Sequence, residues 1–177
     1  MYRDGKLATG IDTLRPIIFS HGLTASDRSY TGLAKELAAH GYCVFLPQHQ
    51  DGSCTYTRTR DGKELFVTWP KTRAHWTNKP LRQRQLNIRV AEIKALIDEL
   101  KEMSPSLHFD IFGDIQSDVK VDMSELVLSG HSFGGITAVT TAATLSSQPK
   151  AVVAFDPWFF ANHERFLDGK LRLQCPV

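Results

Sequence analysis

The chain has 177 residues, of which 42% are hydrophobic and 23% charged, the composition of an ordinary soluble globular protein with a sizeable core. Its formal net charge of +2 at pH 7 gives no reason to expect a nucleic acid as partner. No apolar run is long enough to span a bilayer, and no apolar segment of a signal peptide follows residues 1–6, so cytoplasmic and secreted locations both stay open.

The first quarter of the chain alternates the patterns of strand and helix. Residues 16–20 (P-I-I-F-S) are typical of a buried strand, which runs directly into the His-Gly-Leu segment at residues 21–23. A helix is expected over about residues 29–39, and Gly41 should end it in a left-handed conformation. The next strand is expected over residues 42–46.

The middle of the chain predicts one long helix between two irregular connections. Residues 48–80 are polar with Asp-Gly turn signals, and a loop of this length is usually functional or a lid. Residues 104–125 are irregular as well. Between them, residues 82–103 are amphipathic, and the members of the apolar face are Leu86, Val90, Ile93, Ile97 and Leu100.

The last third of the chain returns to alternating elements. A short apolar strand at residues 126–129 precedes a helix of small residues from 136 to about 145, and a further strand follows at 150–155. Residues 175–177 resemble the beginning of one more strand. This alternation predicts an α/β fold with a mostly parallel sheet and helices on both faces. We expect one domain over residues 1–177, incomplete at both ends.

A nucleophile elbow is the most specific motif. Residues 129–135 read S-G-H-S-F-G-G, a G-x-S-x-G pattern between a strand and a helix. We expect Ser132 to be the nucleophile in a strained turn, with Gly130 and Gly134 required because a Cβ there would collide with neighbouring backbone. The alternative is a glycine-rich helix start. His131 lies inside the elbow, where strand alternation points its side chain away from Ser132.

Two further groups complete most of a catalytic site. Asp156 follows the strand after the elbow helix and is placed to orient a histidine, although an aspartate at a helix cap or turn is the alternative. The expected oxyanion donors are the N–H groups of Phe133 and Leu23. We expect His21 to shape its loop.

The base is expected outside the chain. The chain order of this architecture is serine, acid, histidine, and only His163 follows Asp156, at seven positions and with no strand between them. We therefore expect the base beyond Val177 and keep His163 as the alternative. The remaining histidines are interpreted as ordinary surface or loop residues: His40, His49, His75 and His108.

Four blocks of sequence, in family order, resemble the platelet-activating factor acetylhydrolases, both the plasma and the intracellular type II enzymes. The blocks are Ile17–Leu23 (I-I-F-S-H-G-L), Gln48–Ser53 (Q-H-Q-D-G-S), Gly130–Gly135 (G-H-S-F-G-G) and Ala154–Trp158 (A-F-D-P-W). The helix start at residues 82–84 is similar too. The resemblance implies a calcium-independent phospholipase of the α/β-hydrolase fold.

The resemblance also assigns roles. The family's nucleophile corresponds to Ser132, its acid to Asp156, and its oxyanion donors to Leu23 and Phe133. The chain departs from the family at Gln50, where an arginine is usual, and at residue 157, where proline replaces alanine. The family's histidine lies further toward the C-terminus and its N-terminal region is longer, so the chain resembles a fragment or an abbreviated gene model.

The expected activity is hydrolysis of a short or oxidised sn-2 acyl ester of a phospholipid through an acyl-serine intermediate. The alternatives are another esterase of this fold, acting on polyesters or lactones, and a catalytically silent domain that binds lipid or a partner. No metal or organic cofactor is implied. The three cysteines show neither metal-ligand spacing nor a disulfide framework: Cys43, Cys54 and Cys175.

Contact with a lipid surface is a further hypothesis. Exposed aromatic and cationic side chains suit such an interface, and residues 158–160 (W-F-F) are aromatic. The alternative is that these aromatics belong to the core and that the cations are solvated at a helix start. The cations are Lys71, Arg73, Lys79, Arg82 and Arg84.

Overall fold

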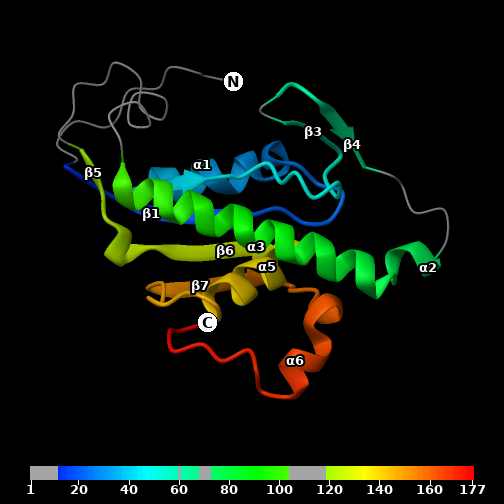
Figure 1. Cartoon of the computed structure of the whole chain (residues 1–177). Coiled ribbons are helices and arrows are strands. Elements are labelled where there is room, and N and C mark those ends of the chain that lie inside the picture. The colour runs from blue at the N-terminus through cyan, green and yellow to red at the C-terminus, as the bar shows by residue number, and fades with distance from the viewer. Residues whose placement is uncertain (1–11, 60, 68–72, 104–118) are drawn as a thin grey trace.

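A parallel sheet forms the centre of the computed structural model (Figure 1). The structure describes residues 12–59, 61–67, 73–103 and 119–177. The main strands lie in the order β2-β1-β6-β7, and their bounds are Tyr42–Phe45, Thr13–Ser20, Val127–His131 and Ala151–Phe155. A short strand, β5 (Lys120–Val121), pairs with the start of β1. The expected α/β class with a mostly parallel sheet is confirmed.

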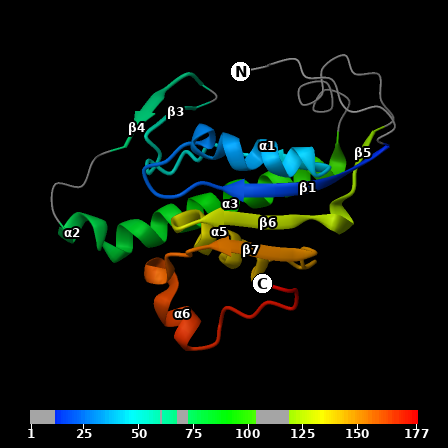
Figure 2. The ribbon, with the colours of Figure 1, turned by 180° about the vertical axis from the view of Figure 1, so that it is seen from behind.

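The strand register places the ends of three strands at one edge of the sheet. Ser20 at the end of β1 pairs with Gly130 on β6, and His131 at the end of β6 pairs with Phe155 on β7. Because all three strands are parallel, the segments that follow them leave the sheet side by side (Figure 2). Asp156 therefore emerges beside the elbow that contains Ser132.

Two helices pack against the sheet and form most of the core. The long helix α3 (Lys79–Glu102) lies across α5 (Phe133–Ala142), as Figure 1 shows. The expected apolar face of α3 is confirmed, since Leu86, Ile93, Ile97 and Leu100 are buried and Val90 packs against them. The helix α1 (Thr31–Ala39) packs on β2 and follows a 3₁₀ turn, η1 (Asp27–Tyr30). Gly41 ends α1 with φ at +86°.

The segment expected to be irregular over residues 48–80 contains regular structure. An antiparallel hairpin joins β3 (Tyr56–Arg58) to β4 (Glu64–Phe66), and a short helix, α2, covers Arg73–Trp76. The helix α3 begins at Lys79, three residues before the expected start. Proline is tolerated in the first turn, where its missing N–H would have no partner, and Asn78 caps the helix by accepting from Leu81 N.

The last segment contains η3 (Phe159–Asn162) and α6 (His163–Leu167). The expected strand at residues 175–177 is absent, but Pro176 O accepts a hydrogen bond of 2.9 Å from Val152 N on β7. A 3₁₀ turn, η2 (Met123–Glu125), leads into β6. No helix in the described ranges is both long and apolar enough to cross a membrane.

Candidate active site

Ser132 occupies a strained turn between β6 and α5. Its backbone has φ 54° and ψ −115°, a conformation that non-glycine residues adopt only when the surroundings impose it. Two backbone hydrogen bonds of 2.9 Å hold the turn, from Ser132 N to Phe155 O and from Trp158 N to Ser132 O. The helix begins at Phe133, three residues before the expected start at Ile136. Gly-Gly has poor helix propensity, and tertiary packing overrides that preference here.

Glycine is required at two positions of the elbow by close backbone approach. A Cβ on Gly134 would lie 1.9 Å from Ser20 O, and one on Gly130 would lie 2.4 Å from the carbonyl group of Gly134. Real Cβ atoms essentially never come closer than 3.0 Å to such atoms. The end of β1 and the start of α5 therefore meet without any side chain between them.

Both expected oxyanion donors lie at this edge. Phe133 is the first residue of α5, so its N–H has no partner within the helix. The N–H of Leu23 donates to no described residue, and Leu23 lies in a turn closed by a bond from Ala25 N to Gly22 O. Thr24 in this turn has φ +61°, which is unusual for a β-branched residue.

A tyrosine links the turn at residues 22–25, named the oxyanion turn below after its expected role, to the elbow. The Tyr30 hydroxyl accepts from Gly22 N at 3.2 Å and lies 2.9 Å from His131 Nδ1. The ring of His131 thus interacts with Tyr30, in line with the expectation that it does not serve Ser132. The contact fixes the Gly22 peptide relative to β6.

Asp156 directly follows β7 and is exposed, with φ +44°. Within the described ranges, no histidine forms a hydrogen bond or ion pair with Asp156, and none bonds to the Ser132 hydroxyl. His163, the alternative base, is exposed at the start of α6. The described residues therefore bring together Ser132, the Leu23 and Phe133 N–H groups and Asp156, the expected nucleophile, oxyanion donors and acid, and no described histidine joins them as a base.

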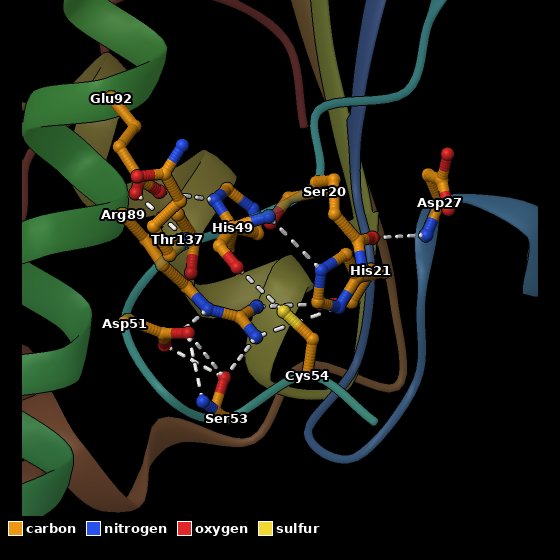
Figure 3. A network of polar contacts seen from close by, with 12 residues as sticks. Ser20, His21, Asp27, His49, Asp51, Ser53, Cys54, Arg89, Glu92 and Thr137 are labelled. Carbon is orange, nitrogen blue, oxygen red and sulfur yellow. Dashed lines mark hydrogen bonds and ion pairs between the residues drawn. The ribbon is translucent and has the colours of Figure 1, made fainter. Parts of the chain in front are cut away.

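His49 is not a surface residue, which corrects the sequence interpretation. Its side chain is fully buried in a polar network beneath the oxyanion turn (Figure 3). His49 Nε2 lies 2.7 Å from the Ser20 hydroxyl, and Nδ1 lies 2.7 Å from Glu92 Oε2 on α3. Burial lowers the pKa of His49 well below its ordinary value and raises that of Glu92 to about 7. His21 is buried beside them, as a residue that shapes the loop would be.

Of the other histidines, His40 is exposed, whereas the His75 side chain and His108 lie outside the described residues.

The aromatic segment at residues 158–160 packs against the protein. Trp158 contacts Phe133 edge-on and stacks on Phe160 at 5.3 Å between ring centroids. Apolar side chains more exposed than these lie on α6, where Phe166 and Leu167 are 51% and 67% exposed.

The cations near the start of α3 do not form one outward face. Arg82 is buried and bonds to Gln85, and Lys79 is paired with Glu164, whereas Arg84 is exposed. The remaining two members of the expected group, Lys71 and the Arg73 side chain, lie outside the described residues.

A hollow of about 600 Å³ opens beside the oxyanion turn. Its lining includes the charged residues Asp27, Arg28 and Arg58 together with Gln48 and Gln50. Neither arginine forms an ion pair with a described residue. In the same ranges, no three His, Cys, Asp or Glu side chains are grouped as a metal site would require.

Comparison with known proteins identifies the family. The model of the family "Platelet-activating factor acetylhydrolase, isoform II" matches residues 1–173. The platelet-activating factor acetylhydrolase of Bos taurus is 29% identical over 156 residues, which cover 81% of this chain and 35% of the bovine protein. A putative phospholipase A2 of Schizosaccharomyces pombe is 25% identical over 143 residues, 68% of this chain and 33% of the yeast protein. The chain thus spans about a third of the length of these relatives.

Solved structures show the same fold at lower identity. A ferulic acid esterase from Streptomyces cinnamoneus superposes with a TM-score of 0.55 at 19% identity, over 81% of this chain and 36% of the esterase. A monoacylglycerol lipase from Paleococcus ferrophilus gives 0.50 at 19% identity, over 83% of this chain and 41% of the lipase.

Proposed function

The chain belongs to the platelet-activating factor acetylhydrolase, isoform II family, and we propose that it forms the nucleophile-bearing part of a phospholipid ester hydrolase. The reaction is release of a short sn-2 acyl group from a glycerophospholipid. The observation that carries the proposal is the strained Ser132 at the same sheet edge as Leu23, Phe133 and Asp156. Bovine and yeast relatives named as an acetylhydrolase and a phospholipase support the substrate class.

In the proposed mechanism the Ser132 hydroxyl attacks the ester carbonyl while a histidine removes its proton. The N–H groups of Leu23 and Phe133 stabilise the negative charge that develops on the carbonyl oxygen. The histidine then protonates the leaving alcohol, and water hydrolyses the acyl-serine. Asp156 orients this histidine, which we place on the C-terminal side of Val177, with His163 as the alternative.

The hollow beside the oxyanion turn supports a phosphate-bearing substrate over a neutral polyester or lactone. Arg28 and Arg58 supply two cations there against the one carboxylate of Asp27, and guanidinium groups suit phosphate oxygens in charge and geometry. The hollow adjoins the turn because Thr55, in its lining, donates to Ala25 O within that turn. We assign the head-group phosphate to this hollow.

The test is ester hydrolysis by this chain and by a version extended past Val177, each with and without Ser132→Ala. In the extended protein, Ser132→Ala should lower kcat by a factor on the order of 10⁴ to 10⁶ without changing the melting temperature. The chain ending at Val177 should hydrolyse p-nitrophenyl acetate hardly faster than its own mutant. Organophosphate labelling should disappear in the mutant, whereas labelling that persists at another serine would contradict the assignment. A folded extended protein that hydrolyses no ester would favour the silent binding domain.

A further inference from the structure

Arg89 on α3 is a fully buried cation beneath the oxyanion turn (Figure 3). Its guanidinium donates from Nε to Asp51 Oδ2 at 2.8 Å, from Nη1 to His21 O at 2.6 Å and from Nη2 to Ser53 Oγ at 2.5 Å. The Asp51 side chain is fully buried as well. Burial alone would raise the pKa of Asp51, but Arg89 and the hydrogen bonds from Ser53 bring that pKa below its ordinary value. Asp51 therefore neutralises Arg89 as a carboxylate.

The same guanidinium touches both halves of the expected oxyanion site. His21 O belongs to the peptide immediately before the one that carries the Leu23 N–H. On another side, the guanidinium carbon lies 4.8 Å from the centroid of the Phe133 ring, within the range of a cation–π contact. One side chain thus restrains the chain next to each donor.

We propose that Arg89 is a positioning residue that holds the Leu23 and Phe133 N–H groups in one arrangement, with Asp51 holding the guanidinium. This rests on the proposed function for the identity of the two donors. The fork geometry matters, since three acceptors in different directions require the several N–H groups of arginine. A lysine ammonium would keep the charge but has a single nitrogen, which cannot reproduce the three directions.

Stability alone gives a weak reason for such a pair. Replacing a buried ion pair with apolar side chains of similar volume is often neutral or stabilising, because desolvation offsets the Coulomb attraction. Arg89 also interrupts the apolar face of α3, between Leu86 and Ile93. The guanidinium of Arg89 makes a hydrogen bond with His21 O and a cation–π contact with the Phe133 ring, and an apolar side chain could make neither.

The first experiment compares amide resonances and does not depend on catalysis. In ¹⁵N-labelled protein, Arg89→Lys should shift the Leu23 and Phe133 amide signals, which substitution of each residue in turn would assign. The matched control is Arg165→Lys on α6, which is exposed and should leave both signals in place. Ser53→Ala removes the Nη2 acceptor and the hydroxyl bond to Asp51 but keeps the Nε and Nη1 bonds of Arg89, so it should shift the signals in the same direction by less. Unchanged Leu23 and Phe133 signals in folded Arg89→Lys or Ser53→Ala would overturn the proposal.

The second experiment measures hydrolysis by the extended protein. Arg89→Lys should lower kcat by about 100-fold, as expected for donors misplaced by roughly 1 Å, with KM changed less than about threefold. A merely structural role would lower the melting temperature and leave kcat of the folded fraction intact, which would also overturn the proposal. If the unmutated protein shows no hydrolysis that depends on Ser132, the proposed function fails, and the amide signals still decide whether Arg89 positions the two N–H groups.

Discussion

Gly134→Ala tests the elbow most directly, because the new Cβ would enter a space filled by backbone. The Cβ would lie 1.9 Å from Ser20 O, 2.5 Å from Ser20 C and 2.7 Å from His21 O. Restoring even the shortest tolerated separation of 3.0 Å requires Ser20 O to move by at least 1.1 Å, which is the difference from 1.9 Å. Ser20 is fully buried and pairs with Gly130, so neither partner can yield by turning a side chain.

The expected loss of stability depends on which elements the new Cβ would force apart. Overpacking a core that can adjust its side chains costs about 1–3 kcal/mol. Here the end of β1 must move from α5, which disturbs the centre of the sheet, so we expect a loss above about 4 kcal/mol. For a protein of this size each kcal/mol corresponds to roughly 2–4 °C in melting temperature, so the fall should exceed about 8 °C.

Two other glycines supply graded controls. A Cβ on Gly135 would lie 3.0 Å from Pro157 Cβ, a contact that a small adjustment relieves, so Gly135→Ala should be milder. A Cβ on Gly32 in α1 would meet nothing within 4 Å, so Gly32→Ala should gain up to about 1 kcal/mol from helix propensity.

The assay is thermal and urea unfolding of the three variants beside the unmutated protein. The expected order of stability is Gly32→Ala, then unmutated, then Gly135→Ala, with Gly134→Ala far below. If Gly134→Ala melts within about 2 °C of the unmutated protein, the close approach of β1 and α5 is wrong. If Gly32→Ala destabilises as much as Gly134→Ala, loss of glycine itself explains the effect and the steric reasoning fails.

Three further predictions concern pH, substrate and lipid. Burial and, to a smaller extent, Arg89 lower the pKa of His21 from 6.5 to about 3, so the unfolded chain binds a proton that the folded protein excludes. The contribution of His21 to stability should therefore be complete above pH 6.5 and fall toward pH 3 by up to roughly 1.4 kcal/mol per pH unit. His21→Asn should remove about one proton from the slope of urea-derived stability against pH, and an unchanged slope would contradict this. In the extended protein, Arg58→Gln should raise KM for a 2-acetyl phospholipid at least about fivefold and leave KM for p-nitrophenyl acetate unchanged. The fivefold change corresponds to the loss of one charge-assisted contact of ~1 kcal/mol or more. Equal effects on both substrates would exclude a phosphate site. In liposome flotation, replacing the exposed Phe166 and Leu167 by serine should reduce any binding more than replacing the half-buried Trp158, and the reverse order would return lipid contact to residues 158–160.

Local sequence patterns were sufficient for the elements that form the site edge. The buried strand before residues 21–23, the G-x-S-x-G turn and the strand before Asp156 each have their signal within about ten consecutive residues. Parallel pairing then leaves little freedom, since the ends of neighbouring strands meet at one edge. For this reason Ser132, Leu23, Phe133 and Asp156 could be grouped before the structure was known, although their catalytic roles stay predictions.

Element boundaries depended on packing more than on propensity. Gly134 and Gly135 disfavour a helix by themselves, yet α5 begins at Phe133 because only glycine fits against the end of β1. The hairpin of β3 and β4 was missed for a similar reason. Its strands have three residues each, too few to show an alternating pattern.

The network beneath the oxyanion turn was decided by tertiary structure alone. Arg89 is separated from His21 by 68 positions and from Asp51 by 38, and no local spacing relates them. One signal was present, an arginine between Leu86 and Ile93 on the apolar face of a long helix, but it does not say which groups the arginine meets. That depends on how α3 lies across α5 and the loop after β2, and packing of the whole chain determines it. His49 shows the same limit: its sequence surroundings are polar, and only the arrival of Glu92 from α3 and Ser20 from β1 buries it.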